Sequence, residues 1–259
     1  MKNLIRWILA SAALTMLFSG GARPHWPVIL SGALAAGVFT LGIAWSEGNW
    51  RHVFVAVFVF ELIVGVINTF DEGVFFHVLS IQQMGGLFAG GTLVSLVLAA
   101  ILAFAPPVRG HLSRDFHFPG RLWARVAVIA VIYLLLYITA GMFVWPHVKS
   151  FYQGRTLPAP GPLLIVEVGR ALIFLVAALP WLRILKGRTR TMLFLGLAYS
   201  ILGGISPLLL PNPIMPANIR LAHGFEVGIS NFIFGAFIGW LMTAKSSPSA
   251  APLPSPVSV

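Results

Sequence analysis

The chain has 259 residues, of which 58% are hydrophobic and 9% are charged, and its mean hydropathy is +0.90. A soluble domain carries about 25% charged residues, so this composition excludes a water-soluble globule of this size. The formal net charge of +10 does not indicate a nucleic-acid partner, because the basic residues stand in short segments between apolar runs and act there as topology determinants. We therefore expect the partner of the chain to be the lipid bilayer. The chain has no cysteine, which excludes thiolate nucleophiles, thiolate metal sites and disulfides within it.

Eight apolar runs predict an all-α fold, a polytopic helical membrane bundle. Each run is close to the length of about 17–25 residues that crosses the hydrocarbon core as a helix. In chain order the predicted spans are Leu4–Gly20, Pro27–Trp45, Val53–Phe70, Gly85–Ala105, Trp123–Trp145, Pro162–Leu182, Thr191–Leu210 and Leu221–Met242. We expect one transmembrane domain over residues 1–245 and a disordered tail, rich in proline and serine, over residues 246–259.

The first run has a second interpretation. Lys2 and Arg6, the apolar stretch Trp7–Phe18 and the small residues Ser19–Ala22 also resemble a secretory signal peptide. No clean A-x-A cleavage site follows, which favours a first span that is retained.

The tryptophans support these boundaries independently. Indole rings favour the headgroup interface, and we expect each one at the end of a span. The eight tryptophans are Trp7, Trp26, Trp45, Trp50, Trp123, Trp145, Trp181 and Trp240.

The distribution of lysine and arginine predicts the orientation. Alternate segments between the spans carry twelve basic residues on one side of the membrane and four on the other. The twelve are Lys2, Arg6, Arg51, Arg109, Arg114, Arg121, Arg125, Arg183, Lys186, Arg188, Arg190 and Lys245. Because the richer side faces the cytoplasm, we expect a multi-pass protein of the cell (inner) membrane with both termini cytoplasmic.

Prolines mark the segments on the other side. Pro146, Pro158 and Pro160 are expected to end helices and stiffen one loop. The segment 211–218 carries three more prolines, and a re-entrant dip into the membrane is the alternative to a loop there.

A few polar residues lie inside the spans or at their outer ends. A charged side chain at the bilayer centre costs about 2.5–3.5 kcal/mol. At about 100° per residue, the polar residues of the third span share a stripe with Gly65. In the sixth span an acid precedes an arginine by three residues, so the two are expected to pair. The candidate polar cavity is formed by Glu61, Asn68, Glu72, Glu167, Arg170, His223 and Glu226.

Glycines predict close helix packing in the last span. Gly224, Gly228, Gly235 and Gly239 share a face with Asn231, and small residues at such spacing let two helix backbones approach in lipid. Gly86 and Gly90 are expected to do the same in the fourth span.

No catalytic motif or metal-ligand spacing is present, and we expect no metal or cofactor. A haem between His77 and His223 is geometrically open but has no other support. The leading hypothesis is a small transporter or permease with an outward-facing polar cavity for a small molecule or a lipid. The alternatives are an outer-leaflet enzyme with a lipid-linked substrate, using His223 or Glu226 as general base, and a non-catalytic membrane scaffold. The sequence does not indicate an oligomeric state.

Overall fold

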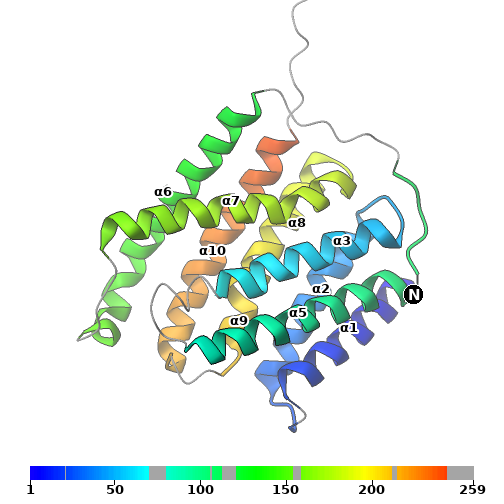
Figure 1. Cartoon of the computed structure of the whole chain (residues 1–259), viewed down its shortest axis with the longest axis horizontal. Helices are drawn as coiled ribbons and strands as arrows, with labels where there is room; N and C mark the ends of the chain where they lie inside the picture. Colours follow the sequence, from blue (N-terminus) through cyan, green and yellow to red (C-terminus); the bar gives the residue numbers. More distant parts are fainter. Residues whose placement is uncertain are drawn as a thin grey trace, which may run out of the picture.

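A computed structural model of the chain describes residues 1–20, 22–69, 80–105, 107–112, 121–153, 159–211 and 215–243. These residues form helices and no strand (Figure 1). The elements are α1 (Lys2–Phe18), α2 (Trp26–Ala44), α3 (Trp50–Glu61), η1 (Leu62–Ile67), α5 (Ile81–Phe104), α6 (Leu122–Tyr152), α7 (Pro160–Ile184), α8 (Arg188–Ser200), η2 (Ile201–Ile205), α9 (Ser206–Leu209) and α10 (Ala217–Met242). The elements η1 and η2 are π-helical turns that continue α3 and α8.

Among the described residues, seven helices are long and apolar enough to cross a membrane, which confirms an all-α polytopic bundle. The helix α1 has 17 residues and falls short of this length. It nevertheless packs against α2 in antiparallel direction, because Thr15 lies beside Gly32 and the indole nitrogen of Trp7 donates to the carbonyl of Ala33. An eighth crossing by α1 therefore stays a prediction.

The connections between helices gather at two ends of the bundle. At one end the backbone NH of Glu47 donates to the carbonyl of Ile184 over 2.7 Å, and that of Trp50 donates to Val108 over 3.0 Å. The guanidinium of Arg188 lies 5.0 Å from the ring centre of Trp240 at the same end. We call this the basic end, defined by residues 45–52, 107–112, 183–190 and 240–243. The end at which α6 finishes and α10 begins is called the opposite end. Cytoplasmic exposure of the basic end stays a prediction.

An aromatic cluster forms the core between the helices. The side chain of Trp181 is fully buried, and its ring centre lies 4.3 Å from that of Phe194 and 6.2 Å from that of Phe39. Trp181 lies near the end of α7, as the sequence predicts, but its indole ring packs in the core. Trp123 at the beginning of α6 is 82% exposed. A position of the tryptophans at the headgroup interface stays a prediction. Position along the helix does not decide the environment here, because the face on which Trp181 lies is turned toward α2 and α8.

The closest helix contact is between α8 and α10, and glycines make it possible. A Cβ atom on Gly235 would overlap the carbonyl oxygen of Leu195, and one on Gly239 would lie 2.8 Å from the Cα of Met192. A Cβ on Gly228 would lie 3.2 Å from the side chain of Ile205. Gly235 and Gly239 therefore have no space for a side chain unless the two helices shift, whereas a methyl group at Gly228 needs only a small movement of the Ile205 side chain.

Other glycines do not make the contact that their spacing predicts. A Cβ atom on Gly224, Gly86 or Gly90 would meet no atom within 4 Å. Among the described residues no helix contacts these three glycines, so their packing stays a prediction. Spacing identifies the face of a helix, but a crossing helix touches that face only over a few turns. The contact between α8 and α10 does not extend to Gly224, and this residue lines an open groove.

The two π-helical turns lie against each other. A Cβ atom on Gly203 of η2 would lie 3.0 Å from the side chain of Val64 of η1. The side-chain amide of Asn231 in α10 donates to the carbonyl of Gly203 over 3.2 Å and approaches that of Tyr199 at 3.4 Å. Because a π-turn interrupts the regular i→i−4 ladder, Asn231 satisfies a carbonyl group at the interruption.

Candidate functional site

The helices α6, α7 and α10 pack against one another, and they cross towards the opposite end of the bundle (Figure 1). Several polar side chains of these three helices lie close together there. Each helix contributes through its own local chemistry. The helix α10 carries His223 and Glu226 three residues apart on one face, and α7 carries Glu167 and Arg170 with the same spacing. The helix α6 contributes tyrosines.

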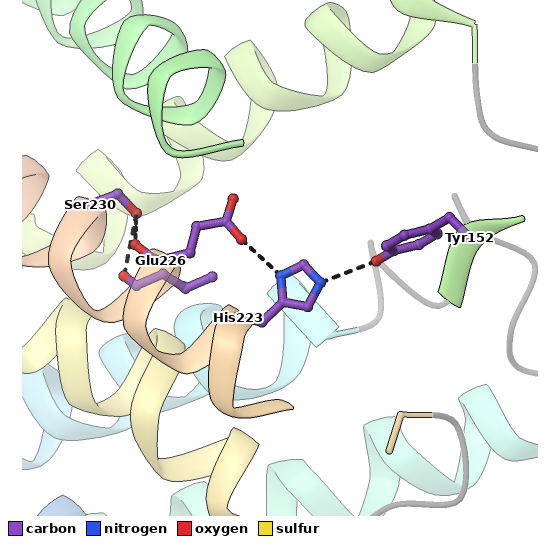
Figure 2. Close-up of polar contacts among 5 residues, drawn as sticks. Tyr152, His223, Glu226 and Ser230 are labelled. Carbon is purple, nitrogen blue, oxygen red and sulfur yellow. Dashed lines mark hydrogen bonds and ion pairs between the residues drawn. The ribbon is translucent and has the colours of Figure 1, made fainter. Parts of the chain in front are cut away.

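A hydrogen-bonded chain links α10 to α6. The Nδ1 atom of His223 lies 2.8 Å from Oε2 of Glu226, and its Nε2 atom lies 3.2 Å from the hydroxyl oxygen of Tyr152. Figure 2 shows the imidazole ring between the carboxylate and the phenol. A carboxylate at Nδ1 favours the tautomer in which Nδ1 carries the proton, which leaves Nε2 as an acceptor for the hydroxyl of Tyr152. The arrangement can pass a proton between a phenol, an imidazole and a carboxyl group.

Tyr152 reaches this position because α6 does not end where the sequence predicted. Pro146 lies inside α6, and the helix continues past it to Tyr152. The expectation that Pro146 ends the helix is wrong. A proline removes one backbone NH and bends a helix, but neighbouring helices in a membrane protein stabilise the helix beyond it. The ring of Trp145 stacks on that of Tyr152 at a centre distance of 6.0 Å and supports this last part of α6.

The pair Glu167–Arg170 is confirmed. The Nη1 atom of Arg170 lies 3.2 Å from Oε2 and 3.3 Å from Oε1 of Glu167. The side chain of Glu167 is 2% exposed and that of Arg170 10%, so the ion pair is buried. Two opposite charges on one face offset the cost of holding either one inside the bundle.

Tyr137 of α6 is half-buried. It interacts electrostatically with Glu167 and Arg170 of α7 and with Glu226 of α10, so the charges of both helices act on the same tyrosine.

Sequence reasoning missed all the residues of α6 in this site. A Cβ atom on Gly141 would lie 4.0 Å from Oε1 of Glu226, so the carboxylate lies beside α6 at this residue. A usable signal was the spacing of Tyr137 and Gly141, which puts a hydroxyl and a small residue on one face of α6. No comparable pattern predicts that Tyr152 belongs to the same helix, because Pro146 lies between it and the rest of α6.

The third span contributes less than predicted. Glu61 is the last residue of α3, and its Oε2 atom is buried without a hydrogen-bond partner among the described residues. Its other oxygen lies over Gly65, 3.0 Å from the position of a Cβ there. Asn68 is buried, and Glu72 lies outside the described residues. Glu61 and Gly65 thus share a face as the stripe predicts, and the rest of the stripe stays a prediction.

The described residues contain no group of three or more histidine and acidic side chains that is arranged to hold a metal ion. Two cavities are described, and neither is lined by the polar residues of the site. One of about 270 Å³ lies along α10 at Gly224 and Gly228, and one of about 530 Å³ lies at the basic end beside Arg51 and Arg183.

Comparison of the chain with models of protein families, with curated proteins and with solved structures finds no match.

Proposed function

We propose that the chain is a proton-coupled carrier of a small molecule, in which Tyr152, His223 and Glu226 exchange protons with the water at the opposite end of the bundle. The observation that carries this proposal is the continuous hydrogen bonding of a phenol, an imidazole and a carboxylate across two helices. Chains of acidic and imidazole groups inside membrane helices form the proton relays of pumps and transporters.

Burial increases along these groups, which supports a path into the bundle. The side chain of His223 is 19% exposed and that of Glu226 11%, whereas that of Glu167 is 2% exposed. Tyr137 of α6 interacts electrostatically with Glu226, Glu167 and Arg170. A proton taken up at His223 therefore has further titratable groups beyond it, in the order of decreasing contact with solvent.

The π-helical turns support a rearrangement of the spans. Interruptions of this kind occur frequently at functional sites, and η1 and η2 interrupt two neighbouring spans at the place where they touch. Glu61 directly precedes η1 and has a buried oxygen without a partner among the described residues. Leaving such an atom without a partner costs about 1–3 kcal/mol, and a second conformation of η1 would relieve this cost by providing one.

Transport can be tested with purified protein in liposomes that contain a pH-sensitive dye. A panel of sugars, amino acids and small carboxylates is added outside, and uptake is recorded together with the internal pH. We expect uptake of one class to change the internal pH. His223→Ala and Glu226→Gln should lower this coupled uptake by about 100-fold or more, as expected for loss of a proton-transfer group.

His147→Ala is the matched control, since His147 is an exposed histidine on α6 towards the same end. Uptake that leaves the internal pH unchanged, or that persists in His223→Ala, would contradict the proposal.

An enzyme of one membrane leaflet is the second candidate, and one observation favours it. Glu226 orients the imidazole of His223 through Nδ1, as a carboxylate does for a general base, and Tyr152 occupies the place of a substrate hydroxyl at Nε2. This assigns His223 as the base and Glu226 as the positioning residue. Conversion of a lipid-linked substrate in detergent solution, where no gradient exists, would separate this candidate from transport.

A further inference from the structure

The larger cavity lies at the basic end of the bundle, far from the site described above. It has a volume of about 530 Å³ and lies between the beginning of α3 and the end of α7. Arg51, His52 and Arg183 form its basic side, and the walls are apolar residues such as Val55 and Leu179. No acidic residue is among the described residues that line it.

The two arginines of this cavity have no carboxylate partner in the part of the chain that the structure describes. Glu47, the acid at this end, is engaged with Lys186 at an N–O distance of 3.1 Å. The guanidinium of Arg51 lies 5.2 Å from the ring centre of Trp50, which positions it at the rim. Both arginines are exposed to solvent, and together they attract an anion to the cavity that they line.

His52 adds a hydrogen-bond donor to the same cavity. Its Nδ1 atom accepts the backbone NH of Asn49 over 3.3 Å as part of the cap that begins α3. Because Nδ1 accepts, a neutral His52 carries its proton on Nε2, which is then a donor. A ligand with several acceptor oxygens satisfies one imidazole and two guanidinium groups together.

The geometry points to a binding site for the phosphate headgroup of an anionic phospholipid, with Arg51 and Arg183 as the phosphate ligands. Arginine binds phosphate through paired, charge-assisted hydrogen bonds, and basic pockets between membrane helices bind lipid headgroups in this way. A lipid fits better than a soluble phosphate because the cavity continues into exposed apolar surface. Val55 is 48% exposed and Val176, one turn from the cavity on α7, is 49% exposed, so acyl chains have a surface on which to lie.

The site is tested by the thermal stability of the full-length protein in detergent micelles with added phosphatidylglycerol, phosphatidylcholine or inorganic phosphate. We expect phosphatidylglycerol to raise Tm at a lower lipid fraction than phosphatidylcholine, and inorganic phosphate to have no effect at millimolar concentration. In the double variant Arg51→Gln/Arg183→Gln the preference for phosphatidylglycerol should fall by about tenfold or more, because each lost charged hydrogen bond changes the binding constant by about that factor.

The matched control is Arg109→Gln/Arg190→Gln, which removes two exposed arginines of the basic end that do not line the cavity. It should keep the full preference. An equal loss in both double variants would mean that surface charge, and not this cavity, attracts the lipid. Stabilisation by inorganic phosphate would assign the site to a soluble anion, and equal stabilisation by both lipids would exclude it. Each of these results overturns the proposal without bearing on the proton relay.

Discussion

Asn231 of α10 donates its side-chain amide to the backbone carbonyl of Gly203, in the middle of the neighbouring span, over 3.2 Å. This bond satisfies a carbonyl group of the π-turn η2 and joins the two most closely packed helices. Asn231→Leu should lower the free energy of unfolding by about 0.6–1.7 kcal/mol, the range of hydrogen bonds between membrane helices. Ser230→Ala is the control, because Ser230 donates only within its own helix. A Tm that is equal in both variants would contradict a structural role of the Asn231 bond.

The glycine contact between α8 and α10 predicts a position-dependent effect of one substitution. Gly235→Leu should strongly reduce yield and Tm, because a side chain there overlaps the backbone of Leu195 and forces the helices apart. Gly224→Leu introduces the same side chain into the same helix at a position with open space, and it should be tolerated. Fluorescence-detected size-exclusion chromatography measures both. Comparable losses in the two variants would count against the described crossing.

The buried pair Glu167–Arg170 predicts strongly non-additive variants. Arg170→Met leaves a carboxylate in a buried site and should cost about 3–5 kcal/mol of stability. Arg170→Met/Glu167→Gln removes both charges and should recover a large part of that loss. A double-mutant cycle measured by chemical denaturation gives the coupling. Additive effects would mean that the two side chains act independently.

Two variants of Tyr152 distinguish its packing on Trp145 from its role in proton transfer to His223. Tyr152→Phe keeps the stack on Trp145 and removes only the hydroxyl group. We expect unchanged Tm and a fall of proton-coupled uptake by about tenfold or more. Tyr152→Leu, which also loses the aromatic stack, should lower both quantities. Full uptake by the phenylalanine variant would remove Tyr152 from the relay.

The predicted orientation can be measured by cysteine labelling, because the chain has no native cysteine. Lys149→Cys and Thr189→Cys place single thiols at exposed positions of the opposite end and the basic end. An impermeant maleimide should label only the first in intact cells. Asn3→Cys tests α1: it should stay unlabelled if α1 crosses the membrane. The reverse pattern at positions 149 and 189 would invert the topology.

Much of the architecture is determined by local properties of the sequence. Apolar length alone determines that Trp26–Ala44, Ile81–Phe104 and Ala217–Met242 are membrane helices, since a backbone in lipid must satisfy its own hydrogen bonds. The pairing of Glu167 with Arg170 is local as well, because residues three apart on a helix are neighbours whatever surrounds them.

The site itself was decided by tertiary structure. Periodicity gives the direction of a side chain around its own helix axis, but it does not say which helix lies on that side or over how many turns the two touch. For this reason Gly224 and Gly235 look alike in sequence, and only Gly235 meets α8. The contact between Tyr152 and His223 joins residues 71 positions apart. It depends on α6 continuing past Pro146. The local propensity of proline disfavours this continuation, and the packing of α6 against its neighbours allows it.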